Sequence, residues 1–101
     1  MNTSVVTPKT ELRISRGELL TSLKERYEFL WHFARKMAVC TRCKCQQTKE
    51  GPYRIYVNGY GDFSIYHRCR DCDYPVRYYV DLSQDRDLRR ELRTIWLTKI
   101  N

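Results

Sequence analysis

The chain has 101 residues, the usual size of one domain, and 42% of them are hydrophobic, which is enough apolar material for one modest core. It carries 19 Lys and Arg against 12 Asp and Glu, and this formal net charge of +7 favours anionic partners, either nucleic acid or an acidic protein surface. No run of about 18 apolar residues and no secretory leader pattern is present, so we expect a soluble intracellular protein, cytoplasmic or associated with nucleoid or nucleus, without a membrane partner.

A flexible arm is predicted for residues 1–14, and a segment that becomes ordered on a partner is the alternative. These residues contain Thr, Ser and Pro8 and show no apolar periodicity. The pattern changes at Ser15, which forms a capping box with Glu18, because the two side chains can satisfy the first free amides of a helix. The rest of the chain, residues 15–101, is expected to form a single domain.

A long helix is predicted over residues 15–38. Apolar residues recur there at three- and four-residue steps and therefore share one face. Phe29 and Phe33 widen this stripe beyond what a small metal-binding module could cover. Part of the apolar surface is therefore expected to meet the C-terminal helix or another chain. The stripe consists of Leu19, Leu20, Leu23, Tyr27, Leu30, Trp31, Ala34, Met37 and Ala38.

Three antiparallel strands and a second helix are predicted in the remainder of the chain. The strands are residues 53–57, 63–67 and 76–80, which alternate and are rich in β-branched and aromatic residues. A turn over residues 58–62 makes the first two a hairpin. Acidic residues after Ser83 and basic residues further on predict a helix over residues 84–99. Its buried stripe is predicted to be Leu88, Leu92, Ile95 and Trp96.

Two Cys-x-x-Cys pairs, Cys40/Cys43 and Cys69/Cys72, lie on either side of the predicted hairpin. Two residues between the cysteines let a tight turn aim both sulfurs at one point, and the hairpin brings the two turns together. Because Zn²⁺ prefers four thiolates in a tetrahedron, this spacing predicts one structural zinc ion. The alternative is a redox pair or buried thiols, although a redox motif normally opens a helix and here strands follow both pairs.

Two neighbouring side chains leave the ligand set open. Cys45 is separated from Cys43 by one residue, which strains joint chelation, so we expect a fifth thiol that does not bind the metal. A spare ligand is the alternative. His67 lies two residues before Cys69 and could approach the site, but a partly buried, hydrogen-bonded strand histidine is the simpler interpretation.

Residues 40–79 resemble a zinc ribbon of the kind found in transcription factors, RNA polymerase subunits and phage regulators. The resemblance implies an α+β fold in which a small three-stranded antiparallel zinc ribbon, residues 39–82, is flanked by the two helices. The resemblance is poorly specific for function, because zinc ribbons serve DNA, RNA and protein recognition alike; nucleic-acid binding or transcription regulation is the function we expect first. Ribbons that stimulate transcript cleavage carry an Asp-Glu pair at the hairpin tip, whereas here only Asp62 is acidic, so that activity is not implied. A looser similarity to small phage late-gene activators rests on the cysteine pairs and the Tyr- and Arg-rich middle.

Arginines and tyrosines alternate along the predicted strands and could share one face of the sheet. Aromatic rings beside guanidinium groups suit the stacking of bases, whereas a solvated sheet face is the alternative. On the C-terminal helix, Arg86, Arg90 and Arg93 recur as in a stripe that contacts phosphates; a solvated helix face is the alternative there. The candidate residues on the strands are Arg54, Tyr56, Tyr66, Arg68, Arg77 and Tyr79.

The sequence favours a binding protein over an enzyme. It has no catalytic constellation and no Gly-rich phosphate loop, and a four-cysteine zinc site has no open position for water. We therefore expect no small-molecule substrate. The first hypothesis is a small zinc-ribbon regulator that binds DNA or RNA. The alternative is a protein-interaction module, an adaptor or inhibitor encoded by a phage or another mobile element, that uses the long helix and the ribbon.

Overall fold

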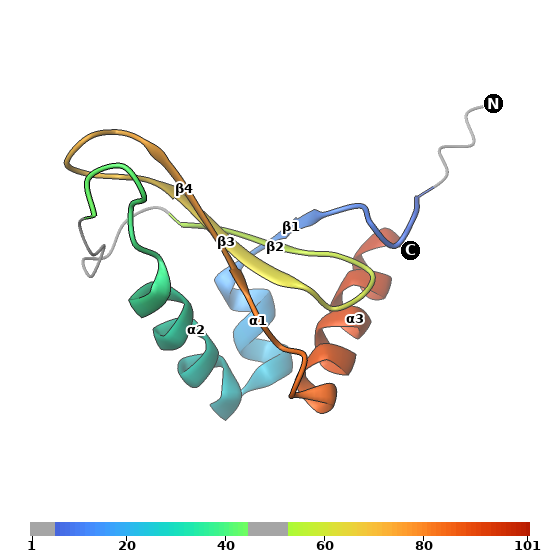
Figure 1. Cartoon of the computed structure of the whole chain (residues 1–101). Coiled ribbons are helices and arrows are strands. Elements are labelled where there is room, and N and C mark those ends of the chain that lie inside the picture. Colours follow the sequence, from blue (N-terminus) through green and yellow to red (C-terminus); the bar gives the residue numbers. More distant parts are fainter. Residues whose placement is uncertain (1–5, 45–52) are drawn as a thin grey trace.

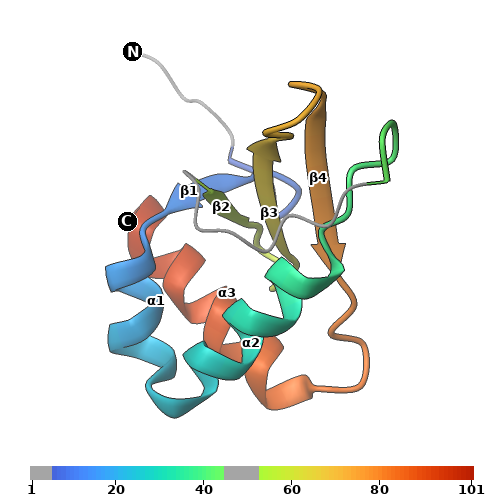
Figure 2. The same cartoon turned by 90° about the vertical axis from the view of Figure 1, so that its left-hand side faces the viewer.

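A computed structural model describes residues 6–44 and 53–101 of the chain. Its three helices lie on one side of a four-stranded antiparallel sheet (Figures 1 and 2). The strands follow one another across the sheet in the order β1-β2-β3-β4. The α+β class is confirmed, and the predicted number of three strands is wrong. The elements are β1 (Leu12–Ile14), α1 (Arg16–Leu23), α2 (Glu25–Met37), β2 (Arg54–Val57), β3 (Phe63–Arg68), β4 (Pro75–Val80) and α3 (Arg86–Ile100).

The fourth strand, β1, lies in the segment that was expected to form part of a flexible arm. It is antiparallel to β2, with Leu12 opposite Val57 and Ile14 opposite Ile55. The indole Nε1 of Trp96 donates a hydrogen bond of 2.9 Å to the carbonyl of Thr10, which fastens the preceding residues to α3. Three residues are too few to show a periodic pattern, so only the pairing with β2 identifies this strand.

The predicted long helix is divided at Lys24. This residue has a φ of 53° and separates α1 from α2, although its amide still donates to the carbonyl of Leu20. The capping box at Ser15 and Glu18 is confirmed. The change of direction lets both helices lie under the sheet (Figure 1), whereas one straight helix would run past it. None of the helices in the described part of the chain is long and apolar enough to span a bilayer.

The main core lies between the helices and the inner face of the sheet. Opposed residues form two continuous rungs across all four strands, because side chains directly opposite in antiparallel strands point to the same face. The four predicted core residues of α3 are all buried. Asp85 caps α3 by accepting a hydrogen bond from the amide of Leu88, so the helix begins at Arg86 and not at residue 84. The rungs are Leu12, Val57, Phe63 and Val80, and Ile14, Ile55, Ile65 and Tyr78.

Candidate metal centre and the outer face of the sheet

The two cysteine pairs lie in turns of the same backbone shape. The first pair follows α2 and the second joins β3 to β4. In each turn the amide of the residue after the second cysteine donates to the carbonyl of the first: Lys44 to Cys40 at 2.9 Å and Asp73 to Cys69 at 2.8 Å. Lys44 and Asp73 also share a left-handed conformation, with φ of 62° and 60°. The repeated geometry turns both pairs of sulfurs in the same way toward a common point.

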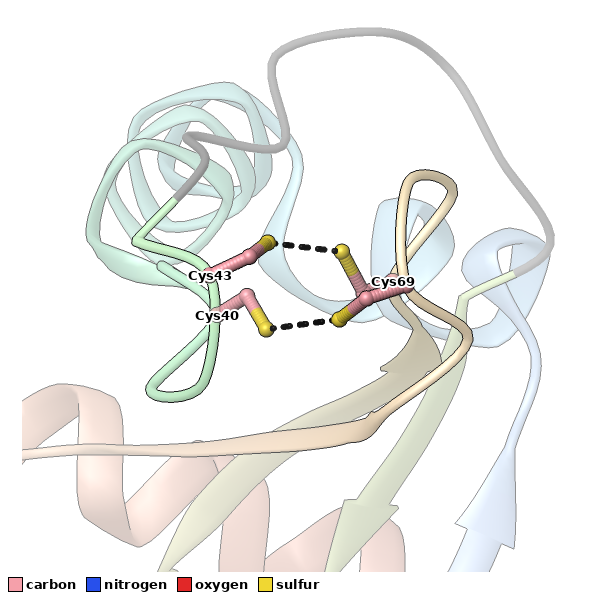
Figure 3. Close-up of side chains that lie close together, drawn as sticks. Cys40, Cys43 and Cys69 are labelled. Carbon is pink, nitrogen blue, oxygen red and sulfur yellow. Dashed lines mark hydrogen bonds between the residues drawn. The ribbon is translucent and has the colours of Figure 1, made fainter.

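The four sulfurs meet in a cluster of the size that one metal ion requires. Figure 3 shows the pair after α2 facing the pair of the β3–β4 turn. The Sγ atoms of Cys40 and Cys72 are 3.6 Å apart, those of Cys43 and Cys69 are 3.5 Å apart, and all four lie within 4.8 Å of one another. A tetrahedron with Zn–S bonds of about 2.3 Å has sulfurs about 3.8 Å apart. The cluster could therefore hold one metal ion, as the spacing of the cysteines predicted.

The environment of these sulfurs favours a bound cation. Cys40 and Cys69 are buried, and Cys43 and Cys72 are partly buried. The amide of Tyr74 lowers the pKa of the Cys72 thiol, but desolvation and the neighbouring thiols outweigh it and raise the pKa to about 12. Thiolates this close repel one another unless a divalent cation lies between them. The donor set therefore suits a soft metal ion that binds all four sulfurs.

His67 does not belong to the four-sulfur cluster that the described residues form. His67 is buried at 5% exposure and burial lowers its pKa, yet neither ring nitrogen has a hydrogen-bond partner within the described residues. The expected hydrogen bond is not found within the part of the chain that the structure describes, where the centroid of the ring lies 4.6 Å from that of Tyr53. Cys45 lies outside the described residues, so its role as a fifth thiol stays a prediction.

The six strand residues proposed for nucleic acid lie on one face of the sheet, the face opposite the helices. Tyr56 pairs with Ser64 and Ser64 with Tyr79, which makes one outer rung. The next outer rung consists of Arg54, Tyr66 and Arg77, and Arg68 follows at the end of β3. Arg13 joins the first rung, opposite Tyr56. It was not among the predicted residues because β1 was not predicted.

Arg77 is the centre of this outer face. Its guanidinium lies 4.7 Å from the ring centroid of Tyr56 and 4.9 Å from that of Tyr79. It also donates to the hydroxyl of Ser64 at 3.0 Å and forms an ion pair with Glu11. The small Ser64 leaves room for the guanidinium between the two rings, and it is itself only 1% exposed. Tyr79 remains 58% exposed, so one large aromatic surface faces solvent.

The other predicted arginines differ in how they are held. The Arg54 guanidinium lies 6.0 Å from the ring centroid of Tyr66. Arg68 instead donates two hydrogen bonds, of 2.9 and 3.3 Å, to the two carboxylate oxygens of Asp73. The hydrogen bond and charge of Asp73 raise the pKa of Arg68, so Arg68 helps to hold the metal-binding turn as well as lying at the edge of the face. On α3, three arginines do not reach the sheet face but line a groove beside the β2–β3 turn. They are Arg86, Arg90 and Arg93.

Comparisons with known proteins assign no family to this chain. No protein-family model matches the sequence, and no match was found among curated proteins or solved structures. The zinc-ribbon resemblance therefore rests on the cysteine spacing and the order of the strands alone. Function has to be argued from the chemistry of the two sites.

Proposed function

We propose that this chain is a small, non-catalytic nucleic-acid-binding protein of the zinc-ribbon kind, with a role in transcription regulation. One structural zinc ion would hold its cysteine turns, and single strands would bind on the outer face of the sheet. The observation that carries the proposal is the Arg77 guanidinium between Tyr56 and Tyr79 on a sheet face that the described helices leave uncovered. The net charge of +7 supports an anionic ligand.

Zinc is the metal that the four sulfurs favour. Four cysteines without a water position make a structural site, because catalytic zinc sites usually keep three protein ligands and one open position. Structural zinc contributes folding free energy directly. Here the zinc ion would join the loop after α2 to the β3–β4 turn, and so fix the end of β3 and the start of β4. Native mass spectrometry of protein purified without chelator should show one zinc ion per chain, and protein without metal would contradict this assignment.

A single strand suits the outer face better than a duplex does. The exposed ring of Tyr79, with the partly buried rings of Tyr56 and Tyr66 on the same face, can stack on unpaired bases, whose faces are hidden inside a double helix. Arg13 and Arg54 on this face would neutralise phosphates, and the Arg77 guanidinium, which is already paired with Glu11, would contribute cation–π contacts. Stacking accepts any base, so we expect a modest sequence preference.

Fluorescence anisotropy with labelled single-stranded and duplex oligonucleotides tests this proposal. Tyr79→Ala should weaken single-strand binding by about 1–3 kcal/mol, the usual contribution of one base stack, and should affect duplex binding less. Tyr74→Ala is the matched control, because Tyr74 is also an exposed tyrosine, at 39%, but lies in the metal-binding turn. Affinity of the unaltered protein should fall by orders of magnitude between about 50 and 200 mM salt.

Two results would contradict the nucleic-acid proposal. One is equal weakening by Tyr79→Ala and Tyr74→Ala, which would remove the outer face from the interaction. The other is the absence of binding to either form below about 100 μM at 50 mM salt, which is weaker than typical nonspecific binding.

A second candidate function is binding to a protein, and the exposed side of α2 favours it. Phe29 is 76% exposed and stacks on Phe33, which is 40% exposed, with ring centroids 6.5 Å apart. Met37 continues this ridge one turn further at 46% exposure. An apolar protein surface would bury these side chains, and its affinity would depend little on salt. Phe29→Ser should abolish such an interaction and leave oligonucleotide binding unchanged.

A further inference from the structure

The turn between β2 and β3 is held against α3 by close backbone contacts. Gly61 has a φ of 82°, and a Cβ atom at this position would lie 2.3 Å from the carbonyl oxygen of Arg89. On the other side of the turn, the amide of Gly59 donates to the carbonyl of Pro8 at 2.7 Å. Arg89 also donates to the carbonyl of Tyr60 at 3.0 Å. These contacts fix Tyr60 beside α3, and Figure 1 shows the β2–β3 turn close to that helix.

A groove of about 490 Å³ runs between this turn and α3, and its lining is strongly basic. Four arginines line it together with Tyr60, and none of the lining residues is acidic. Arg89 is already committed to Tyr60 and to Asp62, which lies 3.4 Å away. No ion pair within the described residues joins the other three arginines to a carboxylate. They are Arg86, Arg90 and Arg93, and all three are exposed.

A second groove of about 480 Å³ lies between this arginine groove and the outer face of the sheet. Tyr60 lines both grooves, and Tyr79 of the outer face lines the second one. Lys9 adds a positive charge there. The two acidic residues of the second groove are already paired, Glu11 with Arg77 and Asp62 with Arg89. A polyanion could therefore pass from Tyr79 to the arginine groove without meeting an unpaired carboxylate in either lining.

We propose that a single strand bound to the outer face continues past Tyr60, and that its next phosphates bind in the arginine groove. This inference rests on the proposed function. It adds the path that the single strand follows over the surface and a minimum length for that strand. Guanidinium groups bind phosphate oxygens through two parallel N–H donors, so exposed arginines suit successive phosphodiesters. The aromatic residues of such a sheet occupy only two or three bases. A pentanucleotide then fills the sheet alone, whereas a pentadecanucleotide reaches the groove.

Oligothymidylates of 5 and 15 nucleotides separate the two sites by anisotropy. The double variant Arg90→Ala with Arg93→Ala should weaken binding of the 15-mer about tenfold or more at 50 mM salt. Its slope of log affinity against log salt should become shallower by about 0.7 for each lost phosphate contact. Binding of the 5-mer should change less than about twofold, since it carries no phosphate beyond Tyr60. Oligouridylates of the same lengths show whether the groove distinguishes DNA from RNA.

The control is the double variant Arg42→Ala with Arg70→Ala. It removes the same charge from the exposed positions between the paired cysteines, away from the groove. If the groove variant leaves the 15-mer unaffected, weakens both lengths equally, or matches the control, the path is wrong. The proposed function still stands in those cases provided that Tyr79→Ala weakens both lengths. If neither oligonucleotide binds the unaltered protein, both proposals fall together.

Discussion

Two ends of the molecule are held together in different ways. We call the core between the helices and the sheet the helix-covered end, and the two cysteine turns the cysteine end. At the helix-covered end, every helix and every strand contributes buried apolar residues to one continuous core. At the cysteine end, the buried cluster among the described residues consists of Cys40, Cys69 and Val76, with Cys43 and Cys72 packed against it. A cluster so small buries too little apolar surface to offset the conformational entropy of ordering two turns. The comparison teaches that the first end can form from burial alone, whereas the second is where a bound metal ion would contribute most to the structure.

The largest expected effect comes from removing a metal ligand. Cys40→Ser should abolish zinc binding and stable folding of the two turns, because structural zinc sites in small domains contribute about 10–16 kcal/mol of apparent binding free energy. Native mass spectrometry should show loss of the ion. Hydrogen exchange should show loss of protection at the start of β4, next to the cysteine turn, while the amides of α3 stay protected.

Cys45→Ser is the matched control for that substitution. The four described cysteines already complete a tetrahedral set, so zinc content and melting temperature should stay nearly unchanged. A loss comparable to that of Cys40→Ser would show that Cys45 is a ligand and that the proposed set is wrong.

A substitution in the helix-covered core should produce the opposite pattern. Leu92 is fully buried, and Leu92→Ala should lower the free energy of unfolding by about 2–5 kcal/mol through lost burial and the cavity left behind. Zinc stoichiometry should remain one per chain under conditions where the variant is folded. Thermal unfolding followed by circular dichroism, with zinc measured in parallel, checks both values. Loss of zinc from folded Leu92→Ala would show that the two ends are not independent.

The features of the fold and of the site that could be predicted from the sequence are those set by residues close together in the chain. The cysteine cluster was predictable because each pair is set by a four-residue turn, and the three longer strands because each alternates by itself. The position of Arg77 between two tyrosines was not predictable, since it depends on Ser64 of the neighbouring strand lying between Tyr56 and Tyr79. β1 was missed because only its pairing with β2, a contact between distant parts of the sequence, identifies it. The break at Lys24 was hidden because the apolar spacing of α1 continues almost in phase into α2.

A smaller effect is expected from relieving the backbone of one metal-binding turn. Lys44 has a φ of 62°, a conformation that costs a residue with a Cβ atom about 1 kcal/mol or more. Lys44→Gly should therefore stabilise the zinc-loaded protein by about 0.5–1 kcal/mol after the greater freedom of glycine in the unfolded chain is counted. Asp73→Gly relieves the same strain but loses the contact with Arg68, so it should gain less. Melting temperatures of the two variants give the comparison, and a larger gain for Asp73→Gly would contradict it.

The smallest effect concerns the ion pair that joins α1 to α3 at the helix-covered end. Both carboxylate oxygens of Glu18 accept from Lys99, at 3.0 and 3.2 Å, and Oε1 also accepts from the amide of Ser15. The hydrogen bond with Lys99 is the largest of the effects that lower the pKa of Glu18 below its ordinary value. The folded protein therefore binds this proton less readily than the unfolded chain. The resulting stability is fully present above the ordinary pKa and is lost as the pH falls through the folded pKa.

Glu18→Gln should isolate that contribution. The side chain is 40% exposed, so solvent screening limits the pair to about 0.2–1 kcal/mol at pH 7, and added salt should reduce it further. Urea unfolding at a series of pH values gives the free energy of unfolding of the variant and of the unaltered protein. Zinc release at low pH affects both proteins alike, so it cancels in the difference between the two free energies. The difference should shrink toward zero as the pH falls through the folded pKa, because both side chains are then uncharged. Glu28→Gln should show a smaller difference, because the Glu28 carboxylate pairs with the exposed His32 one turn further along α2. A difference for Glu18→Gln that stays constant from neutral to acidic pH would mean that the charge on Glu18 does not contribute to the contact between α1 and α3.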